Sequence, residues 1–552
     1  MQDDFSLPAT RVKILTVDMS HEETGLWRQV FAGALSLESF DDASDLNPTN
    51  QDLIIVTSTV NQGDATSAII TDLRDGQARL LVSLQAPRSE APPSLQTWGL
   101  EGTVDLGVGE WYLSPSQAVR ASGIVAEVAL YGHFIEVLPA PEAEIAASIS
   151  VGFRDRAAIV RYGNCTIVGL LPTQQSRGNE RFGRLIRRAV LPPRSRSKSD
   201  FQVGIVGYGA YGGMGHYHGV AIKHTAGLTL GAIAEPTSDR RDLAQEEFAG
   251  IRTYRNAMEL TQDPEIDVVI IATPPSTHFE LASAAIMAGK HIVLEKPMCL
   301  TTREADSLID MARKQNVALS VHQNRRFDAD FLALRELIDS GELGEVFNIE
   351  TFVGGFEHPC RAWHSEETIS GGAAYDWGSH HIDWILQLYG ASPTELFVQS
   401  HKRVWNDITN LDQIRIRMAF QDGREAEFIQ SDIAGVRRPK FYVQGTLGTA
   451  VAHYEPVVKS EVEFPFGFTR TEYHHAEAPV TFKVSLYRGP DSTQELLVGP
   501  RRTAPFSYHA NLSDHLVFGD PLAVTAESVR PVIEVLEVAH HLSAQGDHYA
   551  KL

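Results

Sequence analysis

The stretch FQVGIVGYGAYG, residues 201–212, decides the fold of the surrounding chain. An apolar strand runs directly into glycines that match the pattern G-x-G-x-x-G. Gly207 allows a tight turn, Gly209 lets a pyrophosphate approach the backbone, and Gly212 lets the following helix pack on the strand. The N-terminus of that helix offers unpaired N–H groups and partial positive charge to a phosphate. The sequence therefore predicts a dinucleotide-binding turn made of Gly207, Gly209, Ala210, Tyr211 and Gly212.

The next expected strand, LTLGAIAE at residues 228–235, ends in a carboxylate, that of Glu235. Glu235 in this position accepts hydrogen bonds from ribose hydroxyls and repels a 2′-phosphate, which favours NAD as the cofactor. Arg240 and Arg241 follow closely and are able to bind such a phosphate. NADP is therefore not excluded.

Outward from the glycine-rich turn, apolar strands alternate with helical segments. Further strands are expected at DVVIIAT (267–273), HIVLEKP (291–297) and ALSVHQN (318–324). Continuous apolar strands separated by helices predict a parallel sheet that is covered on both faces. Residues 201–325 are therefore expected to form a Rossmann dinucleotide-binding domain.

From about residue 345 the pattern changes to strand-like alternation, which runs from VFNIETFVGG (346–355) to KFYVQGT (440–446). Such alternation predicts an open, mostly antiparallel sheet with one polar face. We expect an α/β domain over residues 326–552, with a helix at 380–388 and a closing helix at 527–542.

Residues 192–200, PPRSRSKSD, contain no apolar side chain and are predicted to be a linker. Before this linker, short apolar runs alternate with helical patterns such as residues 25–37, which predicts a doubly wound α/β domain over residues 1–191. The chain is thus expected to be a multidomain α/β and α+β protein. The strands expected in the first domain are VKILTV (12–17), LIIVT (53–57), LLVSL (80–84), AAIVR (157–161) and CTIVGL (165–170).

Among 552 residues, Lys and Arg number 48 and Asp and Glu number 70, so the net charge is −22. This charge repels phosphate backbones, and we expect no nucleic-acid partner. Cys165, Cys299 and Cys360 show no CxxC spacing, which fits a reducing compartment. The N-terminus lacks a signal-peptide pattern, and no apolar stretch is long enough to span a membrane. We therefore expect a cytoplasmic protein.

Lys296 lies in Glu295-Lys296-Pro297, at the carboxyl end of the fourth expected strand. Ligands of open α/β sheets bind at the carboxyl ends of strands, so this lysine is placed toward the reactive end of a dinucleotide. Its ammonium group can exchange a proton with a substrate hydroxyl. From position alone, a surface lysine in a salt bridge is an equally good interpretation.

Asp376 and His380 lie four residues apart at the start of a predicted helix, so both can face the same cleft. Histidine acts as a general acid or base near neutral pH, and the carboxylate can hold substrate hydroxyls. A purely structural His–Asp pair is the alternative. His381 is adjacent, but no third ligand has metal-site spacing, so no metal is expected.

Other polar and aromatic residues flank these positions and leave two interpretations open. Trp363 and His364 precede the helix and either line the substrate site or, for Trp363, belong to the core. Arg325 and Arg326 either contact the substrate or brace the two domains.

Residues 200–552 resemble the Gfo/Idh/MocA family of sugar oxidoreductases, because these features occur together and in the family's order. The resemblance is carried by VGIVGYGAYG (203–212), ATPPSTHFELASAAIMAGKHIVLEKPMCLTTREADSLI (272–309), NRRFD (324–328), GGAAYDWGSHHID (371–383) and PLAVTAESVRPVIEVLEVAHHLS (521–543).

The resemblance implies that substrate lies between the Rossmann domain and the C-terminal domain, and that no metal is required. It implies catalytic roles for Lys296, Asp376 and His380. It also implies a homodimer or homotetramer formed through the C-terminal sheet. The implied cofactor contacts beyond the glycine-rich turn and Glu235 are Thr273, Pro274, His278, Glu295 and Lys296. The expected substrate-binding residues are Lys296, Arg325, Trp363, Asp376, His380 and Asp383.

The end of the N-terminal domain, residues 157–190, resembles ThuA-like domains, which are flavodoxin-like relatives of the class I glutamine amidotransferase fold. The likeness extends over about residues 11–190. The chain departs from the amidotransferase pattern because it has no G-x-C-x-G elbow, and Cys165 lies within an expected strand. Leu170 and Leu171 stand where ThuA-like proteins often carry a histidine. The remaining polar candidates are His21, Glu22 and Glu23, for which a solvated loop is the favoured interpretation.

Together these patterns predict an NAD(P)-dependent oxidoreductase that oxidises a secondary hydroxyl of a sugar, glycoside or cyclitol. The fusion to a ThuA-like domain makes C3 of a glucosyl unit one candidate position, since the two families are neighbours in disaccharide use. One alternative is an NAD-dependent glycoside hydrolase or lyase that recycles its cofactor internally. A non-catalytic NAD-dependent sensor is the other.

Overall fold

The computed structural model of the chain describes residues 11–15, 21–31, 36–40, 52–57, 79–84, 100–115, 128–151, 154–163, 165–172 and 180–190. From residue 200 onward it describes every residue except 210–212, 226, 360–361, 455–458, 464–468, 474–478, 490–491, 502–505 and 547. The chain forms two compact units. The first comprises residues 1–200, 225–227 and 509–521, and the second comprises the rest.

The first unit contains a ten-stranded sheet, and its parallel half confirms four of the expected strands, those near residues 12–17, 53–57, 80–84 and 165–170. This half has the order β2 (Ser36–Phe40), β1 (Arg11–Leu15), β3 (Asp52–Thr57), β4 (Arg79–Ser83) and β9 (Cys165–Val168). The helices α1 (His21–Val30) and α5 (Glu180–Val190) bury Trp27, Phe182 and Leu185 in the core of this unit. Cys165 is buried at the start of β9.

The other half of this sheet is antiparallel, and among its strands only β8 (Arg154–Tyr162), which contains the expected AAIVR at 157–161, was predicted from the sequence. This half consists of β8, β7 (Glu144–Val151), β5 (Leu100–Pro115), β6 (Val128–Pro139) and β10 (Leu170–Pro172). Strand β5 interleaves glycines and carboxylates with apolar side chains, and Val108 is 60% exposed. A strand of this composition carries a weak period-two signal, because its apolar residues are not confined to one buried face.

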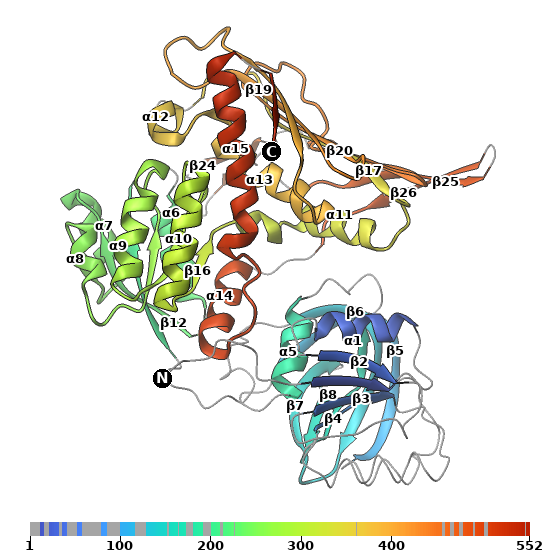
Figure 1. The fold of residues 1–552 in the computed structure, drawn as a ribbon. Coiled ribbons are helices and arrows are strands. Elements are labelled where there is room, and N and C mark those ends of the chain that lie inside the picture. Colours follow the sequence, from blue (N-terminus) through green and yellow to red (C-terminus); the bar gives the residue numbers. More distant parts are fainter. Residues whose placement is uncertain are drawn as a thin grey trace. The chain divides into compact units, whose positions relative to one another are not determined.

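The second unit begins with a six-stranded parallel sheet, which confirms the Rossmann arrangement expected for this part of the chain (Figure 1). Its order is β13 (Arg252–Tyr254), β12 (Leu228–Ala234), β11 (Phe201–Val206), β14 (Val268–Ile271), β15 (His291–Leu294) and β16 (Leu319–Val321). The strand order reverses between β11 and β14, and such a point opens a ligand-binding crevice at the carboxyl ends. The helices around it are α6 (Met214–Lys223), α7 (Ser238–Glu247), α8 (Ala257–Thr261), α9 (His278–Met287) and α10 (Thr302–Gln315).

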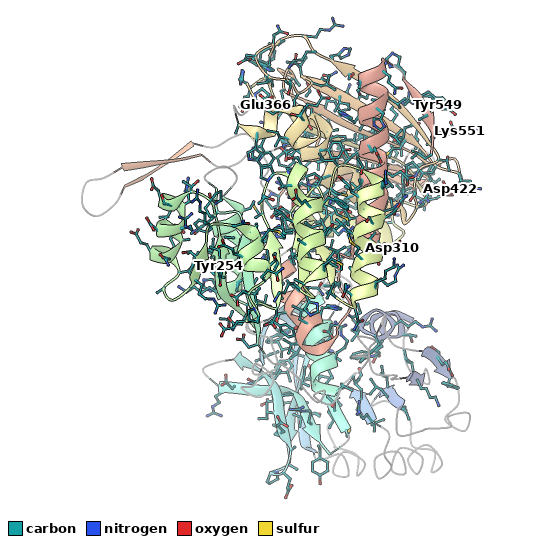
Figure 2. All side chains as sticks on the ribbon, turned by 60° about the vertical axis from the view of Figure 1, so that its left-hand side comes forward. Tyr254, Asp310, Glu366, Asp422, Tyr549 and Lys551 are labelled. Atoms are coloured by element: carbon teal, nitrogen blue, oxygen red, sulfur yellow. The ribbon has the colours of Figure 1, made fainter. Side chains whose placement is uncertain are left out.

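A nine-stranded sheet follows, and only its β17–β20 pair is parallel. Its order is β26 (Ser492–Val498), β25 (Phe482–Gly489), β22 (Gly448–Ala452), β21 (Phe441–Gly445), β17 (Val346–Gly354), β20 (Glu425–Ser431), β19 (Gln413–Ala419), β18 (Glu395–His401) and β27 (Tyr549–Lys551). Figure 2 labels Tyr549 and Lys551 on its terminal strand β27. The remaining elements are α11 (Ala329–Asp339), α12 (Glu367–Ser370), α13 (Ala373–Tyr389), α14 (Ser507–Phe518), α15 (Ala526–Gln545), β23 (Lys459–Glu463) and β24 (Thr469–Tyr473).

Helix α13 packs on one face of this sheet and runs antiparallel to β20. At its last residue the Tyr389 hydroxyl donates to the carbonyl oxygen of Glu425, the first residue of β20, at 2.7 Å. In its middle, the His381 ring lies 5.4 Å from the ring of Phe428. The first turn of α13 therefore lies over the carboxyl end of β20, where the chain leaves the sheet.

None of the helices in the described ranges combines the length and the apolar character that crossing a membrane requires.

Candidate active site

The glycine-rich turn leaves β11 at a residue that only glycine can occupy without strain. Gly207 has a φ of 99°, and a Cβ there would lie 2.6 Å from the carbonyl oxygen of Ala272. Gly209 is exposed, while Ala210, Tyr211 and Gly212 lie outside the described residues. Helix α6 then starts with no acidic residue in its first turn, so its N-terminus is free to attract an anion. The geometry fits the predicted phosphate-binding turn.

Close packing between α6 and the turn depends on a glycine that the motif did not indicate. A Cβ on Gly215 would lie 2.3 Å from the carbonyl oxygen of Gly207. The signal available in the sequence was the glycine run that continues past the motif to Gly213 and Gly215.

Glu235 lies beside this turn, as predicted from its position at the end of the second strand. Its carboxylate accepts hydrogen bonds from the backbone N–H groups of Tyr208, at 2.9 Å, and Thr237, at 3.1 Å. The guanidinium of Arg241 donates to the carbonyl oxygen of Glu235 at 2.6 Å. A carboxylate is therefore held against the turn, and the guanidinium of Arg241 donates to backbone carbonyl oxygens.

The predicted cofactor-side turn at Thr273 and Pro274 follows β14 and is held by buried hydrogen bonds. The hydroxyl oxygens of Thr273 and Thr277 lie 2.7 Å apart. His278 is fully buried, and its two ring nitrogens each lie 2.9 Å from a carbonyl oxygen, one of Thr273 and one of Pro297. Burial lowers the pKa of His278. In this geometry the imidazole ties the turn to the segment that carries Lys296.

Glu295 is buried beneath Lys296 and is held by two histidines from other elements. One oxygen accepts hydrogen bonds from His218 of α6 at 2.9 Å and from His322, just after β16, at 2.8 Å. Its other oxygen accepts from the backbone N–H of Lys296 at 3.1 Å. Burial alone would raise the pKa of Glu295, but the two histidines hold it well below its usual value. The residue is an anionic anchor for the backbone of Lys296.

Lys296 reaches across from the Rossmann domain to the first turn of α13. Its Nζ lies 2.5 Å from a carboxylate oxygen of Asp376 and 3.3 Å from the carbonyl oxygen of the same residue. The two side chains are 22% and 40% exposed, so the pair remains open to a ligand. Burial raises the pKa of Asp376, but the Lys296 ammonium outweighs it and the pKa is lowered. The pair joins a cation and an anion in one accessible site.

His380 lies one turn further along α13 and supplies a neutral base. The residue is 3% exposed, and its Nδ1 is buried without a hydrogen-bond partner among the described residues. Burial, followed by the charges of Lys296 and Arg325, holds the pKa of His380 well below its usual value. A neutral imidazole with an unused nitrogen can take up a proton from a ligand.

Asp383, predicted to bind substrate, is placed differently from Asp376 and His380. Its carboxylate oxygens accept from two nitrogens of Arg326 at 2.8 and 2.6 Å, and both side chains are buried. The same guanidinium also donates to the carbonyl oxygen of Ala523 and the hydroxyl of Ser528. The geometry assigns Asp383 and Arg326 a bracing role within the fold.

The other two predicted substrate residues lie near the Lys296–Asp376 pair. The guanidinium of Arg325 lies 4.6 Å from the ring of Trp377 and 3.2 Å from Asp328. Trp363 stacks on His364 with ring centroids 3.6 Å apart. Burial lowers the pKa of His364, and the charges of Asp376 and Lys296 also act on it.

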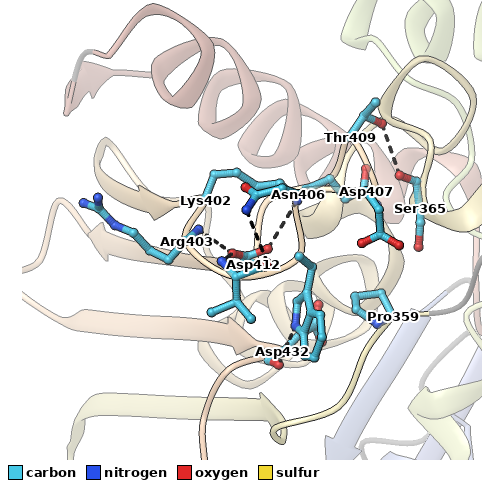
Figure 3. A network of polar contacts seen from close by, with 12 residues as sticks. Pro359, Ser365, Lys402, Arg403, Asn406, Asp407, Thr409, Asp412 and Asp432 are labelled. Carbon is cyan, nitrogen blue, oxygen red and sulfur yellow. Dashed lines mark hydrogen bonds and ion pairs between the residues drawn. The ribbon is translucent and has the colours of Figure 1, made fainter.

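A loop between β18 and β19 borders this region and was missed in the sequence (Figure 3). The buried carboxylate of Asp412 accepts from the backbone N–H groups of Arg403 and Val404 and from the Lys402 ammonium. The Thr409 hydroxyl donates to the carbonyl oxygen of Ser365 at 3.1 Å. The loop is thereby fastened to the segment that follows His364. No local motif announces such a contact, because it joins residues far apart in the chain.

Comparisons with known proteins agree with this geometry. Residues 201–323 match the model of the oxidoreductase family with an NAD-binding Rossmann fold, and residues 331–451 match that of the GFO/IDH/MocA C-terminal domain. The chain is 27% identical over 360 residues to scyllo-inositol 2-dehydrogenase (NADP(+)) IolW of Bacillus subtilis, an alignment that covers 64% of this chain and 96% of IolW.

Other similar proteins are matched over different shares of their length. Myo-inositol 2-dehydrogenase of Thermotoga maritima is 28% identical, over 40% of this chain and 66% of that protein. The oxidoreductase YdgJ of Escherichia coli is 35% identical, over 35% of this chain and 54% of that protein. The structure of the NAD-binding protein from Listeria innocua superposes with a TM-score of 0.54 at 26% identity, covering 64% of this chain and 97% of that one.

Proposed function

We propose that the chain oxidises a secondary hydroxyl of a cyclitol, sugar or glycoside. The basis is that residues 201–323 and 331–451 match the NAD-binding Rossmann domain and the C-terminal domain of the Gfo/Idh/MocA oxidoreductases. The observation that carries the proposal is the contact of 2.5 Å between Lys296 and Asp376, beside the neutral imidazole of His380. A charged pair and a base next to a nucleotide-binding crevice are what removal of a hydroxyl proton requires.

The residues around the glycine-rich turn fit a dinucleotide. Gly207 leaves space that any side chain would fill, α6 presents its N-terminus, and Glu235 places a carboxylate where ribose hydroxyls are expected. When bound, the nicotinamide accepts the hydride that leaves the substrate carbon.

The chain's own residues handle the hydroxyl group. His380 takes up the hydroxyl proton on its imidazole, and the Lys296 ammonium stabilises the negative charge that develops on the oxygen. Asp376 holds Lys296 in place and accepts hydrogen bonds from neighbouring hydroxyls. The carbon–hydrogen bond breaks with its electron pair, and the substrate becomes a ketone.

Two further points support a polyhydroxy substrate. IolW and the Thermotoga maritima protein, both similar to this chain, are named as inositol 2-dehydrogenases. The parallel strand order β2-β1-β3-β4-β9 in the first unit is that of a flavodoxin-like domain, which supports our proposal of a ThuA-like domain over residues 1–191. A fused domain of that kind favours a glycoside, with C3 of a glucosyl unit as a candidate position.

The open face of the C-terminal sheet supports a homodimer or homotetramer. Two exposed apolar pairs lie at its opposite edges, Phe397 with Tyr549 on β18 and β27, and Tyr487 with Leu497 on β25 and β26, and each side chain is at least 44% exposed. Exposed apolar patches on a sheet face are typical of subunit interfaces.

Light scattering is expected to give a molar mass of two or four times that of one chain. The mass of a single chain would contradict this assembly.

The function is tested by absorbance at 340 nm with the full chain, NAD or NADP, and a panel of scyllo-inositol, myo-inositol, glucose and alkyl glucosides. Reduced cofactor that accumulates with one neutral compound supports the proposal. If no compound reduces the cofactor, while nucleotide stays bound through purification and glucosides are cleaved, the internally recycled hydrolase replaces it.

Replacing Glu235 by Gln is expected to raise the ratio of kcat/KM for NADP over NAD by about tenfold. The variant removes the negative charge that opposes a 2′-phosphate and keeps the side-chain size. Both ratios are measured with the best substrate of the panel. Glu246→Gln, on the exposed side of α7, is the control. An unchanged ratio in the Glu235 variant would show that this carboxylate does not select the cofactor.

A further inference from the structure

Asp432 follows the last residue of β20, and the chain's topology brings it to the same end of the sheet as Asp376. Helix α13 runs antiparallel to β20, from Asp376 in its first turn to Tyr389, which contacts the first residue of the strand. The two carboxylates are close enough that Asp376 acts electrostatically on Asp432. Asp432 therefore borders the site of the Lys296–Asp376 pair.

The backbone of Asp432 is fixed, while its carboxylate is unused. Its N–H donates to the carbonyl oxygen of Asp412 at 2.9 Å, and its carbonyl oxygen accepts from the indole N–H of Trp405 at 3.1 Å (Figure 3). Its carboxylate makes no hydrogen bond or ion pair with any described residue. A half-buried carboxylate held in this way is available to a ligand.

A group of aromatic side chains contacts the backbone of Asp432 through the indole of Trp405. The ring of Trp405 lies 4.8 Å from that of His358 and 6.0 Å from that of Phe356, and Phe356 is 56% exposed. The hydrogen bond from Trp405 to Asp432 ties the indole to the carboxylate-bearing residue. An aromatic surface beside hydrogen-bond acceptors suits a ring that carries hydroxyl groups.

The charges that face Asp432 are mostly negative. They are Asp376 on α13, Asp412 and Lys402 on the β18–β19 loop, and Glu357 after β17. The Lys402 ammonium donates hydrogen bonds to the carboxylate of Asp412, at 3.2 Å, and to the carbonyl oxygen of Asn410, at 2.5 Å. Lys296 is likewise paired with Asp376. Asp432 thus adds a negative charge that Lys402, which is paired with Asp412, offsets only in part.

We propose that Asp432 is a specificity-determining residue of the substrate site, which admits neutral polyhydroxy compounds and rejects phosphorylated or carboxylated ones. This inference rests on the proposed function, because it assigns Asp432 to the same substrate site. An anionic substrate would meet a partly desolvated carboxylate that forms no ion pair with a described residue, whereas a hydroxyl group can donate a hydrogen bond to it.

The rejection is expected to depend on pH. Burial, with Asp376 and Asp412 next in effect, raises the pKa of Asp432 to about 7. Below that pH the carboxyl is protonated and tolerates an anion, and above it the carboxylate repels one. Binding of an anion should therefore weaken by about tenfold between pH 6 and pH 8, while binding of a neutral analogue stays constant.

The probes are glucose and glucuronate, which match in size and differ in one charge that does not titrate between pH 6 and pH 8. Their dissociation constants are measured by calorimetry on the full chain with NADH, and their inhibition constants against the best panel substrate. We expect Asp432→Asn to bind glucuronate about tenfold more tightly at pH 8 and to lose the pH dependence. Asp432→Glu keeps the charge and should keep the discrimination.

Asp422→Asn is the matched control, because Asp422 lies in the β19–β20 turn at the opposite end of β20 (Figure 2). Glucuronate affinities that are the same in Asp432→Asn and the unsubstituted chain would overturn the inference and leave the dehydrogenase proposal intact. Charge-dependent binding without turnover of any panel compound would overturn the dehydrogenase proposal alone. If neither probe binds and no compound is turned over, both proposals fail.

Discussion

Substitution of Lys296 by Met is expected to reduce the rate of cofactor reduction by about 10³-fold, with little change in the affinity for the nucleotide. Methionine matches the length of lysine but removes the ammonium that lies 2.5 Å from Asp376. The charge that develops on the substrate oxygen then has no partner, and Asp376 is left as an uncompensated anion. The loss should appear in kcat, because the interaction is strongest in the transition state.

The measurement is the steady-state rate at 340 nm with the substrate identified in the panel. Lys314→Met, an exposed position on α10, is the control for the loss of one lysine. Nucleotide binding is followed separately by the quenching of tryptophan fluorescence. A Lys296 variant that keeps more than a third of the activity would remove this residue from the mechanism.

Substitution of Lys440 by Met is expected to lower the free energy of unfolding by about 3 kcal/mol. Lys440 Nζ lies 2.7 Å from a carboxylate oxygen of Asp330, and the two side chains are 2% and 0% exposed. Asp330 also accepts hydrogen bonds from the N–H groups of Phe331 and Val480, which leave its charge in place. Removing the ammonium therefore leaves the Asp330 carboxylate buried in the core without an ion-pair partner.

Urea unfolding, followed by circular dichroism and tryptophan fluorescence, measures the loss. Lys483→Met is the control, because its partner Glu495 and Lys483 itself are both more than half exposed, and such pairs contribute about 0–1 kcal/mol. The double variant Asp330→Leu, Lys440→Met should recover most of the stability, since neither charge remains. Equal losses in the Lys440 and Lys483 variants would contradict the assignment.

The sequence predicted the features that depend on local pattern. The strands of the Rossmann sheet were visible as apolar runs, and Gly207 and Glu235 follow directly from their positions at strand ends. The structure brings Lys296, Asp376 and His380 into one site, which agrees with the spacing of Asp376 and His380 and with the resemblance.

Features that depend on distant contacts were not visible in the sequence. The glycine run extends to Gly215, but the run alone does not show that α6 approaches the turn closely at this residue. The resemblance implied a substrate-binding role for Asp383, yet Arg326 occupies its carboxylate. Asp432 follows a strand whose sequence carries no motif. Its proximity to Asp376 becomes visible only from the antiparallel arrangement of α13 and β20 in the structure.

The hydrogen bonds around Glu295 connect two ends of the cofactor crevice. One carboxylate is fastened to α6 through His218, to the end of β16 through His322, and to the backbone of Lys296. The N-terminus of α6 is the predicted phosphate-binding site, so the same helix connects that site to Lys296. The connection between α6 and the backbone of Lys296 runs through the buried side chains of His218 and Glu295. The phosphate end of the crevice and the lysine are therefore coupled through one buried carboxylate.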